Sequence, residues 1–126
     1  MKTPQRIALH RKSRTLEVIW PEGSFTLPAE YLRVFSPSAE VRGHGRGQEL
    51  LQHGKINVAI TGVEAAGNYA LKIIFDDGHD SGIYSWDYLY DLACNQQSRW
   101  QDYLQRLEAA GRSRDPDTSV VKFVSF

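Results

Sequence analysis

Hydrophobic and polar positions alternate near the start of the chain, as they do in half-buried β-strands. Residues 15–20 place Leu16, Val18 and Trp20 on one side and Glu17 on the other. This period of two predicts a strand, and its β-branched and aromatic residues favour one. Polar or Pro-Gly breaks separate it from two shorter extended segments, residues 6–10 and 24–27. We therefore expect an antiparallel meander of three short strands.

The pattern is less regular in the next third of the chain. Residues 28–32 suit one helical turn that begins with a proline. Residues 33–55 predict irregular structure. They contain the Gly- and Arg-rich loop Gly43-His-Gly-Arg-Gly47, whose backbone amides suit either an anion or a plain surface loop. Residues 48–52 suggest another helical turn. The alternation of isoleucine and valine over residues 56–60 predicts a fourth strand, and residues 61–68 a loop.

A hairpin and two helices are predicted after residue 68. Residues 69–75 and 79–84 read as strands on either side of Asp77-Gly78, a pair that favours a two-residue turn. Ser85 is expected to cap a helix. Its apolar stripe recurs at i, i+3, i+4 and i+7 and consists of Trp86, Leu89, Tyr90 and Ala93.

A second helix is predicted immediately after the first. Ser98 and Gln101 have the spacing of a capping box. Gly111 has the position of a C-terminal cap, and the apolar positions between them fall on one face: Trp100, Tyr103, Leu104 and Leu107. Cys94, at the end of the first helix, is expected to be buried or half-buried and unreactive.

Together these elements predict the α+β class, with short antiparallel strands in one or two small sheets and two C-terminal helices packed on one face. We expect a domain over residues 1–111, then a polar linker and an apolar tail over residues 112–126. The tail, Val120–Phe126, suits an edge strand of this domain or a peptide that adds to a partner's sheet, including that of a second copy. The predicted core comprises Ile7, Leu16, Val18, Trp20, Val58, Ile60, Ile73, Phe75, Ile83, Trp86, Leu89, Trp100, Leu104 and Leu107.

Composition narrows the function classes. Fifteen Lys and Arg residues balance fifteen Asp and Glu residues, so no net field attracts nucleic acid or an anionic membrane. The chain has no apolar run long enough to span a bilayer, and its first residues lack the apolar core of a signal peptide. A single cysteine excludes an internal disulfide and favours the cytoplasm. We expect a cytoplasmic protein that binds neither nucleic acid nor membrane.

Two sequence strings resemble a known family. The first is Ser36-Pro-Ser-Ala-Glu-Val41, preceded by Leu32-Arg33. The second is Asp77-Gly-His79 followed by Gly82-Ile-Tyr-Ser-Trp-Asp-Tyr-Leu89. Both resemble the small bacterial proteins grouped as domain of unknown function 971, a family similar to the N-terminal domain of gamma-butyrobetaine hydroxylase. The resemblance covers about residues 5–110.

The resemblance raises the question of a metal. In the hydroxylases the corresponding domain holds a structural zinc through three cysteines and a histidine, and those positions fall on Ser36, Ser38, Val41 and His79 here. Zinc requires thiolate, imidazole or carboxylate ligands. Two of these residues offer only hydroxyls and a third has no donor, so we predict no zinc and no other cofactor at this cluster.

The sequence gives little indication of another metal site or of catalysis. His79 has Asp76, Asp77 and Asp80 beside it, which leaves open a metal site of one histidine with carboxylates. These residues also suit a hairpin turn. No serine lies in a Gly-x-Ser-x-Gly elbow, and no catalytic constellation is found, so we expect no enzyme.

The resemblance implies a binding or scaffold role. The hydroxylases' catalytic iron site lies in a separate domain, and a similar module is appended to some iron–sulfur cluster carrier ATPases of the Mrp type. We therefore expect a non-catalytic module for an unidentified protein partner, and the resemblance implies a link to iron–sulfur cluster assembly. The alternative is a metal-binding protein that uses His79 with nearby carboxylates. Tyr84 and Trp86 suit either a core or a partner surface. The binding surface is predicted to comprise Arg33, Ser36, Ser38, His79, Tyr84 and Trp86.

Overall fold

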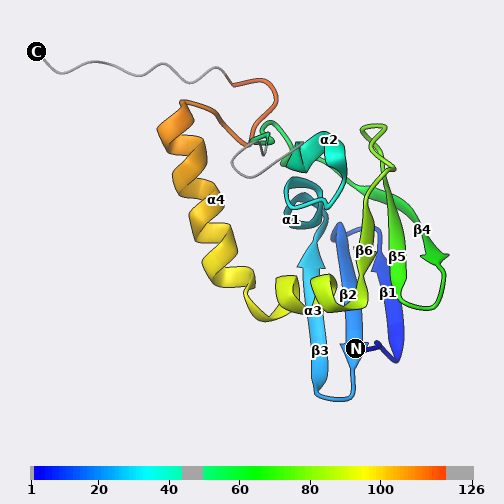
Figure 1. Cartoon of the computed structure of the whole chain (residues 1–126). Coiled ribbons are helices and arrows are strands. Elements are labelled where there is room, and N and C mark those ends of the chain that lie inside the picture. The colour runs from blue at the N-terminus through cyan, green and yellow to red at the C-terminus, as the bar shows by residue number, and fades with distance from the viewer. Residues whose placement is uncertain (1, 44–49, 119–126) are drawn as a thin grey trace, which may run out of the picture.

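A computed structural model describes residues 2–43 and 50–118 of the chain (Figure 1). Within this part, two three-stranded antiparallel sheets and four helices form an α+β fold, which confirms the predicted class. In chain order the elements are β1 (Arg6–His10), β2 (Thr15–Trp20), β3 (Gly23–Pro28), α1 (Ala29–Val34), α2 (Ala39–Arg42), β4 (Ile60–Ala66), β5 (Ala70–Phe75), β6 (Ile83–Ser85), α3 (Trp86–Cys94) and α4 (Gln96–Ala110). Most of the predicted basic loop, part of the turn at residues 48–52 and the predicted tail lie outside the described residues.

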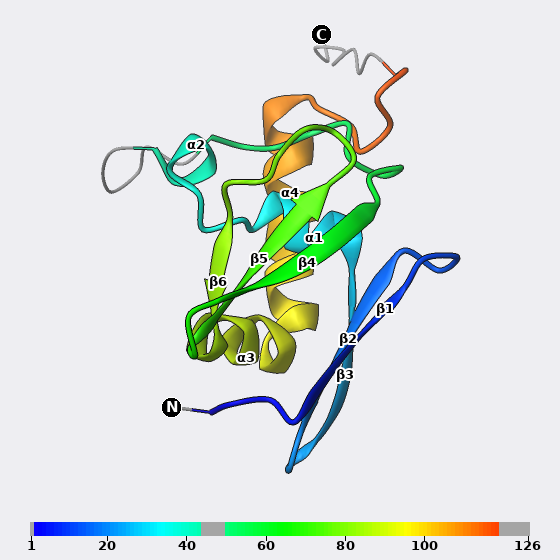
Figure 2. The ribbon, with the colours of Figure 1, turned by 90° about the vertical axis from the view of Figure 1, so that its right-hand side faces the viewer.

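The first sheet is the predicted meander. Its order is β1-β2-β3, with Leu16 paired to Leu27 and Val18 to Phe25. Alternate residues of β2 are buried, as the period of two predicts. Figure 2 shows this sheet, in blue, and the second sheet, in green, as separate layers. Their facing side chains meet in one core, with Leu16 and Val18 from one layer and Ile73 and Phe75 from the other.

The second sheet departs from the prediction at its first strand. Its order is β4-β5-β6. The expected strand at residues 56–60 is wrong, because residues 56 and 57 lie in a turn and the strand starts at Ile60. The expected loop at 61–68 is largely β4, which pairs with β5 and has a register shift between Ile60 and Gly62. Strands β5 and β6 pair antiparallel as predicted, but the expected two-residue turn at Asp77-Gly78 is wrong, because β6 starts only at Ile83 and seven residues, 76–82, connect it to β5.

The C-terminal helices largely follow the sequence. The Ser85 Oγ accepts a hydrogen bond from the Tyr88 N–H at 3.1 Å, which confirms the predicted cap. Gly111 ends α4 in the left-handed conformation, with φ of 66°, also as predicted. The capping box is wrong: α4 starts at Gln96, and the Ser98 hydroxyl donates to the Asn95 carbonyl from inside the helix. No described helix combines the length and apolar content needed to cross a membrane.

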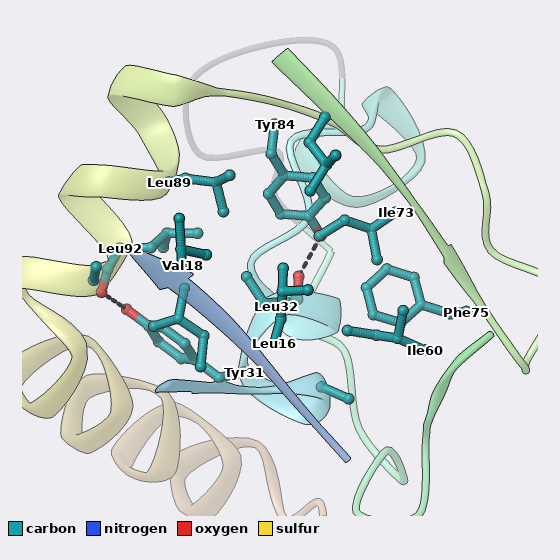
Figure 3. Close-up of a cluster of buried hydrophobic side chains, with 14 of the residues drawn as sticks. Leu16, Val18, Tyr31, Leu32, Ile60, Ile73, Phe75, Tyr84, Leu89 and Leu92 are labelled. Atoms are coloured by element: carbon teal, nitrogen blue, oxygen red, sulfur yellow. Dashed lines mark hydrogen bonds between the residues drawn. The ribbon is translucent and has the colours of Figure 1, made fainter. Parts of the chain in front are cut away.

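Helix α1 lies at the centre of the molecule, and all six of its residues are buried. Four consecutive residues are bonded to four different parts of the chain. The Arg114 guanidinium donates to the Glu30 carboxylate, and the Tyr31 hydroxyl donates to the Leu92 carbonyl of α3. The Leu32 carbonyl accepts from the Tyr84 hydroxyl of β6, and Arg33 donates to Asp77 in the β5–β6 loop. Figure 3 shows the Tyr31 and Tyr84 bonds within the core.

The core corrects several sequence expectations. Ile83 is 54% exposed, because it lies on the outer face of β6. Ile7, Trp100 and Leu104 are only half-buried, and Cys94 is exposed at the end of α3. The other predicted core residues are buried. Large buried residues that the predicted core did not include are Leu27, Tyr31, Leu32, Tyr84, Leu92 and Tyr103.

The described residues after α4 are packed on the domain rather than forming a free linker. The Arg114 guanidinium donates to both Glu30 carboxylate oxygens, at 2.8 and 2.6 Å, and lies 5.1 Å from the Trp100 ring. The backbone N–H groups of Gly54 and Ile56 donate to the carbonyls of Ser113 and Arg114. Ser113 and Arg114 are therefore bonded to the domain, and the boundary at residue 111 stays a prediction.

Candidate functional site: a buried polar cluster beside an arginine-lined cleft

The six residues predicted as a binding surface are all buried. Arg33 lies in the last turn of α1, Ser36 and Ser38 connect α1 to α2, and His79 lies in the β5–β6 loop. Tyr84, in β6, extends under them, with its ring beside Gly82. These five residues are brought together. Trp86 lies at the opposite end of β6, where its backbone and indole N–H groups donate to the Tyr69 and Asn68 carbonyls.

Hydrogen bonds connect Ser36, Ser38, Glu40, His79 and Ser81, which we call the polar cluster. The Ser36 Oγ lies 2.8 Å from the His79 Nε2 and accepts the Ser38 N–H at 3.2 Å. The Ser38 Oγ lies 2.7 Å from the Ser81 Oγ, and the Glu40 Oε2 lies 3.2 Å from the His79 Nδ1. These bonds join the start of α2 to the β5–β6 loop.

Asp77 forms a second junction directly beside the polar cluster. Its Oδ2 accepts from the Arg33 Nε at 2.8 Å and from the Lys55 Nζ at 2.7 Å, and its Oδ1 accepts the His79 N–H at 3.1 Å. Burial raises the pKa of the Asp77 carboxyl, but the hydrogen bonds from Lys55, the His79 backbone and Arg33 outweigh burial and lower it to about 2. The carboxylate is therefore ionised throughout the neutral range and holds the loop to α1.

Burial also determines the charge of His79. It lowers the pKa of the His79 imidazole below 6.5, and the Arg33 guanidinium lowers it further, while the Glu40 carboxylate opposes both effects. The ring is therefore neutral near pH 7. If its Nδ1–H donates to Glu40, its Nε2 accepts the Ser36 O–H, and the Ser36 oxygen remains free to accept from Ser38.

Stability is expected to decrease when the pH falls below about 6.5. Because the folded-state pKa of His79 is the lower one, the unfolded chain takes up the proton first. The contribution of neutral His79 to the free energy of unfolding is complete above about pH 6.5. It is lost as the pH falls toward the folded-state pKa, and the free energy of unfolding then decreases by at most about 1.4 kcal/mol per pH unit. Urea unfolding followed by tryptophan fluorescence, from about pH 7.5 to about pH 5, measures this slope.

The substitution His79→Gln should flatten that profile. A His79→Gln profile as steep as that of the wild type would show that other groups cause the pH dependence.

The bonds from Glu40 through His79 to Ser36 have the order of a catalytic triad. Space does not allow that chemistry, because the Ser36 side chain is 1% exposed. The backbone of Gly82 lies so close that a Cβ there would be 2.5 Å from the Ser36 Oγ. An acyl group on that oxygen would need the same space. The arrangement therefore supports a structural role for these hydrogen bonds rather than nucleophilic catalysis.

The positions that correspond to the hydroxylases' zinc ligands do come together, but their chemistry does not fit zinc. Ser36 and Ser38 bear hydroxyls that bond to neighbouring groups, and Val41 is buried without a donor atom. His79 uses its Nε2 to bond Ser36. One imidazole is the only strong zinc ligand among the four residues.

Removal of metal is therefore expected to leave stability unchanged. Dialysis of the untagged protein against a chelator should shift the thermal midpoint by less than about 1 °C, because hydrogen bonds already satisfy the polar cluster. Differential scanning calorimetry before and after dialysis measures the shift. A fall of several degrees that zinc addition reverses would contradict the prediction.

The alternative metal site around His79 finds limited support in the geometry. Within residues 2–43 and 50–118, no group of three or more His, Cys, Asp or Glu side chains is arranged to hold a metal ion. Asp77 is engaged by Arg33 and Lys55, while the Asp76 carboxylate accepts the Ala59 N–H. The acids beside His79 thus serve the loop, as the turn interpretation implies.

A cleft of about 370 Å³ lies beside the polar cluster, between α2 and α4. We call it the α2–α4 cleft. Buried Val34 and Val41 and half-buried Phe35 line its apolar part, and Leu50, which is 59% exposed, stands at its edge. Its other lining residues come from the same region: Ser36, Arg42, Leu51, Gln52, Tyr88, Arg99, Asp102, Tyr103 and Arg106.

The sequence interpretation missed several residues that pack against or bond to the residues of this site. Gly82 interrupts a predicted strand, and such a glycine often marks a close backbone approach. Glu40 stands two residues after Ser38, where its N–H donates to the Ser38 Oγ in a helix cap. Lys55 carried no comparable signal, because its partner Asp77 is distant in the sequence.

The fold and the site define a small α+β domain in which a hydrogen-bonded polar cluster fixes the wall of an open cleft. The family described as "Gamma-butyrobetaine hydroxylase-like, N-terminal" matches residues 7–90, about two thirds of the chain. The chain belongs to this family, and the resemblance inferred from its two sequence strings is confirmed. No curated protein matches the chain significantly.

Solved structures agree with this assignment. Two structures determined by NMR in solution are 58% and 50% identical to the chain, with TM-scores of 0.85 and 0.78. The first covers 99% of both chains, and the second covers 99% of this chain and 95% of its own. A crystal structure from Acidithiobacillus ferrooxidans, described as a protein of unknown function in the DUF971 family, is 35% identical with a TM-score of 0.61. It covers 72% of this chain and 92% of its own.

Proposed function

We propose that this chain is a non-catalytic, cytoplasmic protein-binding module whose working surface is the α2–α4 cleft. The observation that carries the proposal is the contrast between the two halves of the site. Ser36, Ser38 and His79 of the polar cluster are buried and bonded within the cluster, whereas the adjacent cleft is open and combines Leu, Tyr and Arg side chains. Tyr and Arg are enriched where partners bind. The exposed free thiol of Cys94 is consistent with a reducing compartment.

Site-specific photocrosslinking tests this proposal. A benzophenone amino acid replaces Leu50 at the edge of the cleft, or Ile83 on β6 as the control; these side chains are 59% and 54% exposed. After irradiation of cells, the Leu50 form should yield a crosslinked protein that mass spectrometry identifies, and the Ile83 form should not. Equal crosslinks from both positions, or none from Leu50, would contradict the proposal.

The identified partner, once purified, allows a matched comparison. Leu50→Asp should weaken its binding about tenfold, because the charge enters an apolar part of the contact. Ile83→Asp introduces the same change outside the cleft and should leave the dissociation constant unchanged. Loss of binding in both variants would indicate a charge effect unrelated to the cleft.

Two finer proposals concern the identity of the partner and self-association. The family resemblance supports a partner that handles iron–sulfur clusters, and the identity of the crosslinked protein tests this link. Residues 120–126 carry five apolar side chains in seven, which supports self-association. Sedimentation analysis of the full chain, and of Phe123→Asp, tests it: a dimer that persists in the variant would contradict a role for this segment.

A further inference from the structure

The charges of the α2–α4 cleft narrow the choice of partner. Three arginines line it, Arg42, Arg99 and Arg106, against one acid, Asp102. Arg106 and Asp102 form an exposed pair at 3.4 Å, and such surface pairs contribute little. Arg42 lies 4.9 Å from the centre of the Tyr88 ring, with its guanidinium exposed. The cleft is therefore locally cationic, although the whole chain has no net charge.

Arg99 adds a donor that the described residues leave without an acceptor. Its Nη2 pairs with the Asp91 carboxylate, and its guanidinium lies 5.9 Å from the Phe35 ring. Its Nε is buried and has no hydrogen-bond partner within the described part of the chain. A buried N–H without an acceptor costs about 1–3 kcal/mol. The Arg99 side chain as a whole is 34% exposed, so part of it is open to a ligand in the cleft.

Resting on the proposed function, we propose that the cleft binds a short acidic segment of the partner protein, with Asp or Glu residues next to an aliphatic or aromatic residue. The carboxylates would contact Arg42, Arg99 and Arg106, since guanidinium groups match carboxylates in geometry. The apolar side chain would lie against Leu50 and Phe35. The cleft has a volume of about 370 Å³, which accommodates a few residues of a ligand but not a folded domain.

The same features argue against a polyanion such as RNA. Binding of nucleic acid requires a cationic field that extends over many phosphates, whereas the cleft has three arginines and the whole chain has no net charge. Asp102 lies among them and would repel an unbroken row of phosphates. Discrete carboxylates separated by apolar side chains avoid this repulsion.

Peptide selection on the immobilised full chain tests the inference. A displayed library of random dodecapeptides is selected on the wild type, on Arg42→Gln/Arg106→Gln, and on Arg6→Gln/Lys12→Gln. The last variant removes the same charge from exposed positions outside the cleft. Wild type and control should enrich peptides with an acid beside an apolar residue, and the cleft variant should not. Peptides with Asp and Glu changed to Asn and Gln should bind at least about tenfold more weakly in calorimetry.

The outcomes separate this inference from the proposed function. Enrichment of neutral or basic peptides, or equal enrichment on the cleft variant, would overturn the acidic ligand. If the Leu50 crosslink forms nevertheless, the cleft binds its partner by apolar contacts. If the Leu50 crosslink also fails, the proposed function falls with it. Enrichment of RNA but not peptide, in a parallel selection from a random RNA pool, would overturn the choice of a protein ligand.

Discussion

Replacing Gly82 with alanine is expected to lower the free energy of unfolding by about 3 kcal/mol. The new Cβ would lie 2.5 Å from the Ser36 Oγ and 3.1 Å from the nearest atom of the Tyr84 ring. Real Cβ contacts are not that short, so the hydroxyl must move. It then loses its bonds to the His79 ring and the Ser38 N–H, and these buried groups are left without partners. Urea unfolding at pH 7.5 measures the loss.

Two comparisons isolate the cause of this loss. Gly62→Ala in β4 meets only Ile74, at 3.8 Å, and should change stability by less than about 0.5 kcal/mol. In a Ser36→Ala background the clash with the hydroxyl is absent, so Gly82→Ala should cost about 1 kcal/mol. Equal costs in both backgrounds would show that Ser36 is not the residue that excludes a side chain at position 82.

Asp77→Asn is expected to lower the free energy of unfolding by about 2 kcal/mol at neutral pH. The amide keeps the size of the side chain but removes the charge that holds Arg33 and Lys55. The value follows from the pKa of the Asp77 carboxyl, which lies at about 2 instead of 3.8. Because the folded-state pKa is the lower one, this stability is complete above about pH 4 and is lost as the pH falls to about 2.

The acid limb of the stability profile tests this assignment. Wild type should lose stability between about pH 4 and about pH 2 more steeply than Asp77→Asn, because the variant lacks the titrating group. Urea unfolding at fixed ionic strength provides both curves. Parallel limbs for Asp77→Asn and wild type would mean that another carboxyl controls acid unfolding.

The elements that could be predicted from the sequence are those whose local chemistry agrees with their environment. Strand β2 alternates along its length, and Ser85 and Gly111 have side chains or backbone freedom suited to the ends of helices. Strand β4 could not be predicted, because Gly62 and a run of small residues favour a loop. It becomes a strand by pairing with β5, and that pairing depends on contacts distant in sequence.

The sequence indicated which residues come together at the site, but it did not indicate that they are buried. Ser36, Ser38 and His79 converge, yet all three are buried, because hydrogen bonds between loops satisfy them. No periodic pattern distinguishes a polar residue that is buried with a partner from one in solvent. The sequence analysis did not identify the arginines of the α2–α4 cleft as a group. Their positive charges come together only when α2, α3 and α4 fold together. The net charge of the whole chain does not reveal this local excess.

Helix α1 sets a strict limit on how this chain can change length. Its residues 30–33 each bond to a different segment, and neighbouring helical residues point about 100° apart. A single inserted or deleted residue within Ala29–Val34 would rotate every later side chain away from its partner at once. A substitution can alter one of these contacts at a time, whereas an insertion or deletion of one residue breaks several of them together. We therefore expect related sequences to vary in length in their surface loops and to keep this segment at a constant six residues.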